Sequence, residues 1–175
     1  RNTMMHPNPE IEVIINGATE LAKKHQHEYV TVEHLFLSMI RFLPFRELLA
    51  KFGADISELD SDLEKYIIKQ GSYIKHRRDE EEPGPKKTHA LERLFNRALT
   101  QVLFSGRDHI QIIDLFLSIT AETNSHAAYF IVKYGLERQQ VLHFYNKNYS
   151  EAPGRVADIT QKADEILDEY CDNLS

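Results

Sequence analysis

The chain has 175 residues, of which 42% are hydrophobic, so it can bury one sizeable core together with a short appendage. Most of its net charge of −6 lies in residues 151–175, where seven acids accompany two bases, and the remainder lacks the basic face that nucleic-acid binders use. The single cysteine, Cys171, excludes an internal disulfide framework and a thiolate zinc cluster, and it favours the cytoplasm. No apolar run is long enough to cross a bilayer.

The first eight residues are predicted to be a lead without a function of their own. They lack the hydrophobic stretch of a secretion signal, and the pair Met4-Met5 indicates that the natural start lies there, after Arg1 to Thr3.

The first predicted helix returns later in the chain as part of an internal repeat. Its apolar residues follow helical spacing between Ile11 and Ala22, and the same pattern recurs between Leu91 and Val102 at a constant offset of 80 residues. The next helix repeats at the same offset: the apolar positions of 32–39 recur in 112–119.

In the second unit, a two-residue insertion precedes the third and fourth predicted helices and raises the offset between the units to 82 residues. At offset 82, the apolar positions of 45–52 recur in 127–134, and each segment ends at a glycine, Gly53 or Gly135, which suits a left-handed C-terminal residue. A further helical pattern follows each glycine, over 56–67 and over 141–145.

These patterns predict an all-α fold of eight helices, arranged as two tandem four-helix repeats about a pseudo-twofold axis. Repeat 1 covers about 9–70 and repeat 2 about 88–149 of one domain, 9–149. The charged, Pro-Gly-Pro-containing stretch 71–87 is predicted to be a solvated connector. Residues 150–175 are expected to be an acidic linker with a tail helix that has no partner in this chain.

Three histidines, His25, His27 and His34, form the most conspicuous candidate metal site, because neutral imidazole is a good zinc ligand. Their spacing matches no zinc motif, and repeat 2 replaces the first two by Ser105 and Arg107. We therefore expect no physiological metal here, only solvated loop histidines that could capture zinc adventitiously.

Other chemical motifs are weaker still. The segment 84–89 lacks the glycine that a phosphate loop needs before its lysine, and the acidic surroundings of Cys171 disfavour a reactive thiolate. Thr31 is expected to cap the helix that begins at Val32. Gly17, inside the first helix, is expected to mark a close helix crossing.

The duplicated unit, with HEYVTVEHLFLSMI in its first copy, resembles the N-terminal domain of the ClpA family of AAA+ unfoldases. The turn Ser105-Gly106-Arg107 and the stretch LDEYCDNL at 167–174 match motifs of that family, and the resemblance covers residues 9–174. It implies a bacterial, cytoplasmic, ATP-dependent unfoldase that delivers proteins to the ClpP peptidase. ATP and magnesium would be held by ATPase modules beyond Ser175, so this chain is expected to have no cofactor and no catalytic residues.

The resemblance also implies a role and a site for this domain. It would dock protein substrates and the ClpS adaptor, which delivers proteins with destabilising N-terminal residues. The adaptor-binding residues implied by motif are Glu28, Glu33, Thr88 and Arg97. The sequence pattern is compatible with a surface role for these residues. Arg93 and Arg97 lie outside the apolar stripe of their predicted helix, and Glu33 is expected on an exposed first turn.

Two alternatives remain open from the residues alone. A free-standing helical peptide-binding module would use the same fold without an ATPase, and a small metal hydrolase would use the three histidines. Neither nucleic acid nor a membrane is expected as a partner. The chain is predicted to be monomeric, and the parent protein is expected to be a hexamer built by its ATPase modules.

Overall fold

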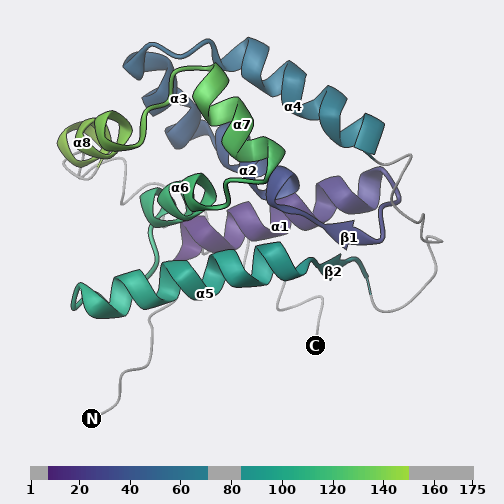
Figure 1. Ribbon diagram of the computed structural model, residues 1–175, viewed down its shortest axis with the longest axis horizontal. Coiled ribbons are helices and arrows are strands. Elements are labelled where there is room, and N and C mark those ends of the chain that lie inside the picture. Colours follow the sequence, from purple (N-terminus) through teal and green to yellow (C-terminus); the bar gives the residue numbers. More distant parts are fainter. Residues whose placement is uncertain (1–7, 71–83, 150–175) are drawn as a thin grey trace.

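The computed structural model describes residues 8–70 and 84–149 (Figure 1). Its helices are α1 (Pro9–Lys24), α2 (Val32–Arg41), α3 (Leu43–Phe52), α4 (Ile56–Gln70), α5 (His89–Phe104), α6 (Ile112–Ala121), α7 (His126–Lys133) and α8 (Arg138–Asn148). Two-residue strands, β1 (Tyr29–Val30) and β2 (Lys86–Lys87), pair in parallel. The predicted all-α fold with eight helices is thus confirmed, although the strand pair was not foreseen. The predictions for 1–7, 71–83 and 150–175, Cys171 included, fall outside the described residues.

The two repeats correspond helix by helix, with α1 to α4 matching α5 to α8 in order (Figure 1). Within each repeat, the first helix packs on the second, and the second also packs on the third and fourth. Between the repeats, α3 contacts α8 while its counterpart α7 contacts α4, and the equivalent helices α2 and α6 contact each other. This exchange of equivalent partners is what a pseudo-twofold arrangement requires.

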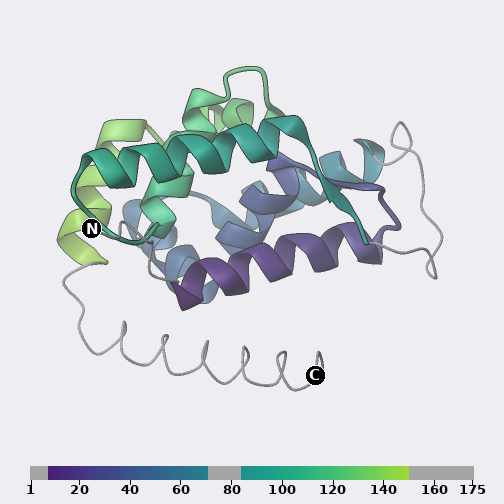
Figure 2. The same cartoon turned by 90° about the horizontal axis from the view of Figure 1, so that it is seen from below.

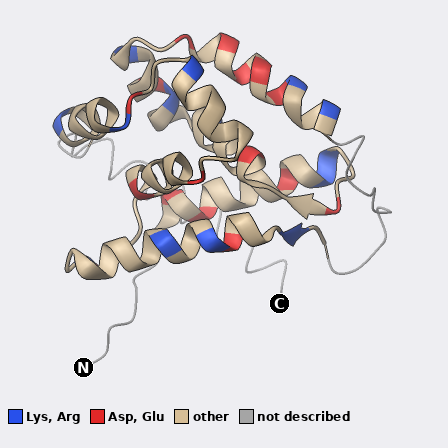
Figure 3. Cartoon of the chain, viewed as in Figure 1, with Lys and Arg blue, Asp and Glu red and all other residues tan. Residues whose placement is uncertain are grey.

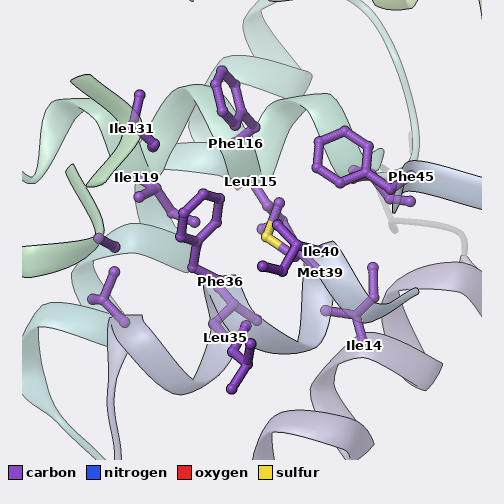
Figure 4. Packing of buried hydrophobic residues seen from close by; sticks show 14 of the residues in the cluster. Ile14, Leu35, Phe36, Met39, Ile40, Phe45, Leu115, Phe116, Ile119 and Ile131 are labelled. Carbon is purple, nitrogen blue, oxygen red and sulfur yellow. The ribbon is translucent and has the colours of Figure 1, made fainter. Parts of the chain in front are cut away.

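The core lies around α2 and α6, the equivalent second helices of the two repeats. In α2, every residue from Val32 to Ile40 is buried, because this helix is covered by α1, α3 and α4 of its own repeat and by α6 and α7 of the other. Phe36 and Phe116 lie at equivalent positions and are both fully buried (Figure 4). Phe45 of α3 meets Phe116 edge to face at 6.4 Å, so aromatic packing also joins the repeats.

Left-handed residues end the helices where the sequence predicts them. Gly53 follows α3 with φ 112° and Gly135 follows α7 with φ 70°. Gly106, after α5, has φ 73°, and its equivalent after α1 is Gln26, which adopts φ 58° without being a glycine. The same turn is therefore built in both repeats, although only one of them carries the residue that adopts it without strain.

The close crossing predicted at Gly17 is confirmed. A Cβ added to Gly17 would lie 2.4 Å from Oγ of Ser38 on α2. That hydroxyl is not free to move aside, because it donates a hydrogen bond of 2.7 Å to the carbonyl oxygen of Ile14. α1 and α2 can approach this closely only because position 17 has no side chain.

Candidate adaptor-docking site

The strand pair brings the starts of α2 and α5 together, although they are nearly sixty residues apart in sequence. The backbone N–H of Lys86 donates to the carbonyl oxygen of Glu28 (2.9 Å), and that of Thr88 donates to Val30 (3.1 Å). Glu28 and Thr88, two of the four predicted docking residues, therefore flank one short ladder, which is visible in both views (Figure 2). Residues 86–87 of the predicted connector are thus hydrogen-bonded to repeat 1, which their charge pattern did not indicate.

A cavity of about 270 Å³ opens beside this junction and is lined by both repeats. Glu33 and Tyr66 come from repeat 1, and Thr88, Arg93 and His126 come from repeat 2. Thr88 also caps α5, since its hydroxyl accepts a hydrogen bond from the N–H of Leu91 at 3.2 Å. We call this opening the junction cavity. It unites Glu33 and Thr88, as the predicted docking face requires, with a mixture of polar and aromatic groups.

Glu33 is not the exposed surface charge that its place in the first turn of α2 predicts. It is only 8% exposed, and its carboxylate accepts a hydrogen bond of 3.0 Å from the N–H of Ala127 in the first turn of α7. The carboxylate thereby satisfies a buried donor and faces the positive end of the helix dipole. The expectation of exposure was wrong, because α7 of the other repeat covers this turn.

Arg97 is tied to the junction cavity through Glu122. Glu122, 8% exposed, accepts two hydrogen bonds from Arg93 (2.7 and 3.0 Å) and one from Arg97 (2.9 Å). Hydrogen bonds from Arg93, and then from Arg97, hold the pKa of the Glu122 carboxyl below its ordinary value against the opposing effect of burial. Both arginines belong to α5, which carries basic and acidic segments (Figure 3). Arg93 lines the junction cavity, whereas Arg97 lines a second cavity.

Several residues of the junction cavity were not singled out as site residues. Glu122 follows α6 where the repeat shows no acid, since its equivalent at the offset of 80 is Phe42. Tyr66 and His126 stack at 4.1 Å across the two repeats, and the sequence indicates only packing at both positions. Burial raises the pKa of the Tyr66 phenol to about 12, with a further contribution from Glu33. Tyr66 therefore stays neutral and serves as a stacking group for His126.

Two of the three candidate metal ligands are buried and paired with each other, so the expectation of solvated histidines was wrong. His27 Nδ1 lies 3.0 Å from His34 Nε2, and His34 Nδ1 lies 3.0 Å from the backbone nitrogen of Thr31. Because a backbone N–H can only donate, His34 Nδ1 accepts; its proton sits on Nε2 and is donated to His27. Thr31 also caps α2 as predicted, accepting from the N–H of His34 at 3.3 Å. His25 stacks on His27 at 5.6 Å.

Within the parts of the chain that the structure describes, no group of three or more His, Cys, Asp or Glu side chains is placed to hold a metal ion. In the same residues, no helix has the length and apolar character needed to cross a membrane.

His34 is expected to make the fold sensitive to acid. Burial, followed by the nearby imidazoles of His27 and His25, lowers the pKa of His34 from 6.5 to about 3. Between those values the unfolded chain binds a proton that the folded chain does not, so the stabilisation is complete above pH 6.5 and is lost as the pH falls. At about pH 5, the loss should be roughly 2 kcal/mol.

The measurement is chemical denaturation of the parent and of His34→Gln between neutral pH and about pH 5, the window in which the unfolded histidine titrates. Glutamine can still accept from the Thr31 N–H, so it keeps the capping interaction while removing the titration. The variant should show a flatter decline of stability with falling pH. Equal slopes for the two proteins would show that His34 is not the group responsible.

Comparison with known proteins agrees with this architecture. The family model of the Clp repeat (R) N-terminal domain matches residues 7–134. A ClpA homolog protein from Fuscovulum blasticum is 28% identical over 143 residues, which cover 82% of this chain and 18% of the relative. The chain therefore spans less than a fifth of the length of that curated relative.

Solved structures show the same fold at low sequence identity. The Hsp104 N-terminal domain from Candida albicans superposes with a TM-score of 0.66 at 13% identity, covering 85% of this chain and 93% of that one. The N-terminal domain of the ClpV1 ATPase from an E. coli type VI secretion system gives 0.60 at 18% identity, covering 78% and 81%.

Proposed function

Because the chain belongs to the Clp repeat N-terminal domain family, we propose that it is the adaptor- and substrate-docking domain of a ClpA-type unfoldase in the bacterial cytoplasm. The parent protein would use ATP and magnesium in its ATPase modules, assemble as a hexamer and pass unfolded proteins to the ClpP peptidase. This domain would bind the ClpS adaptor, and it would itself be non-catalytic.

The observation that carries the proposal is the meeting of the two repeats at the β1–β2 ladder. The four residues implied by motif come from both repeats. Glu33 and Thr88 line one polar opening, and the backbone of Glu28 belongs to the ladder next to it. Arg97 does not line this opening, but it forms an ion pair with Glu122, which does. An adaptor that binds and leaves repeatedly suits such a polar contact of modest area, in which charge complementarity governs association.

The roles of the four residues differ within this proposal. Thr88 and Arg93 line the opening, and the Arg93 side chain is 57% exposed. Glu28, partly exposed on the neighbouring ladder, would extend the contact to repeat 1. Glu33 is engaged by α7, so it shapes the wall of the cavity by holding that helix. Arg97 orients Glu122, and through it Arg93.

Glu28→Arg is the variant that tests this surface with the least damage to the fold. The part of Glu28 that pairs with β2 is its backbone carbonyl, so the melting temperature should change little. A reversed charge on the docking face should weaken ClpS binding about tenfold or more, which corresponds to ~1.4 kcal/mol per decade. Calorimetric titration with the cognate adaptor measures the effect.

The matched control is Glu58→Arg on α4, an exposed position outside the junction cavity. Glu64 on the same helix is less suitable, because it pairs with Arg41 at 2.6 Å. Parent-like affinity for Glu28→Arg, or an equal loss in the control, would mean that the adaptor binds elsewhere.

A further inference from the structure

Repeat 2 contains a second and larger cavity, of about 430 Å³, between α5, α6 and α8. Nothing in the adaptor-docking proposal accounts for it. Its lining includes three guanidinium groups, from Arg97, Arg107 and Arg138, and one carboxylate, from Asp114. In a chain with a net charge of −6, this is a local excess of positive charge. We call it the arginine cavity.

The three arginines are not equally engaged. Arg107 donates two hydrogen bonds to Asp114 (2.9 and 2.7 Å), so its charge is balanced within the fold. Arg97 uses only Nη1, which donates to Glu122 and to the carbonyl oxygen of Ser118; its other N–H groups bond to nothing in 8–70 or 84–149. Arg138, exposed at the first position of α8, forms no salt bridge with any described residue. Two guanidinium groups thus retain donors for an anion.

The uncharged lining of the arginine cavity also suits an oxyanion or a peptide. Gln101, Gln111 and Asn146 contribute amide side chains, each able both to donate and to accept hydrogen bonds. Guanidinium groups bind carboxylates through paired N–H donors, which gives both strength and orientation. The volume lies toward the lower end of the usual range for ligand pockets, about 300–1,000 Å³, and is large enough for one or two peptide side chains.

An exposed aromatic side chain lies at the same end of α5. Phe104 is 88% exposed, and its neighbours along the helix, Gln101 and Ser105, both line the arginine cavity. A phenylalanine this exposed has no role in the core, and its ring offers an apolar packing surface next to the cavity lining. A ligand that fits both features combines a carboxylate with a nearby apolar group.

We propose that the arginine cavity binds an acidic segment of an extended polypeptide, with its carboxylates held by Arg97 and Arg138 and an apolar side chain packed on Phe104. Nucleic acid fits less well, because a phosphate backbone needs a continuous basic face and residues 1–150 carry almost no net charge. The site would give the domain a contact with client polypeptides separate from the junction cavity. It does not depend on the adaptor proposal.

The test uses the 175-residue chain and two fluorescein-labelled hexapeptides, Gly-Asp-Glu-Leu-Asp-Gly and its amide twin Gly-Asn-Gln-Leu-Asn-Gly, followed by fluorescence anisotropy. The acidic peptide should bind and the twin should bind at least tenfold more weakly. Arg138→Glu should weaken the acidic peptide about tenfold or more, since it places like charges in contact. Phe104→Ser should weaken both peptides. Inorganic phosphate, added alone, serves as the probe for a simple anion site.

Lys147→Glu is the matched control, because it makes the same charge change on α8 nine residues away, on the opposite side of the helix and outside the cavity lining. It should leave peptide affinity unchanged. Equal binding of the two peptides, parent-like affinity of Arg138→Glu, or binding of phosphate without the acidic peptide would overturn the proposal. ClpS titration of Arg138→Glu should match the parent, so failure here is distinguishable from failure of the docking proposal.

Discussion

Replacing Arg107 by methionine is expected to lower the free energy of unfolding by about 2 kcal/mol. Asp114 is 6% exposed, and it both pairs with Arg107 and accepts from the N–H of Gln111 at 2.8 Å to cap α6. Without the guanidinium group, a buried carboxylate would lose its balancing charge. The loss should be smaller than for a fully buried pair, because the Arg107 side chain is 35% exposed. Urea denaturation at neutral pH measures it.

The control for Arg107→Met comes from repeat 1. His27 and His34 occupy the positions equivalent to Arg107 and Asp114, and there both partners are imidazoles joined by a hydrogen bond. The double variant Arg107→His, Asp114→His should therefore recover much of the stability, since histidine at 114 can accept from the Gln111 N–H and donate to its partner. A double variant less stable than Arg107→Met would contradict the equivalence of the two pairs.

Glu33→Ala should lower the free energy of unfolding by about 2 kcal/mol, even though Glu33 lies on the first turn of a helix, where an acid is usually a surface group. The alanine leaves the buried N–H of Ala127 without an acceptor. Glu33→Gln keeps an acceptor oxygen and should retain most of the stability. Thermal and urea denaturation of the two variants provide the comparison, and equal losses would show that the hydrogen bond to Ala127 is not what Glu33 contributes.

This prediction also affects how docking experiments on Glu33 are interpreted. A charge reversal there would disturb α7 and the wall of the junction cavity, so weaker adaptor binding would not identify a direct contact. Glu28 avoids this ambiguity, because its structural role is carried by its backbone.

The helices could be predicted from the sequence because their apolar positions recur at fixed offsets and because glycines mark their ends. Those signals are local, and each is present twice. The ladder between β1 and β2 could not be predicted, since a two-residue strand has no periodicity and its partner follows a charged connector. Pairing of this kind depends on where the two repeats place their first loops.

Two of the candidate residues, Glu33 and Thr88, line one cavity, but the burial of Glu33 was not predicted. The repeat itself contained the missing information about Glu33, whose equivalent at the offset of 80 is Ile113, a buried residue in α6. An acid that replaces a core isoleucine must find a donor inside the protein. Similarly, the alignment of His27 with Arg107 and of His34 with Asp114 indicates a pair in each repeat. Glu122 had no such signal, because its partners come from α5.

Hydrogen exchange of the chain with and without saturating ClpS adaptor tests the central claim most directly, namely that the adaptor docks where the two repeats meet. Exchange is followed by mass spectrometry over the whole chain. Docking at the junction cavity should slow exchange in 26–33 and in 84–93 together, since the ladder joins these segments, and should leave α8, which does not line this cavity, unchanged. Slowed exchange in only one of the two segments, or confined to α3 or α8, would contradict the account.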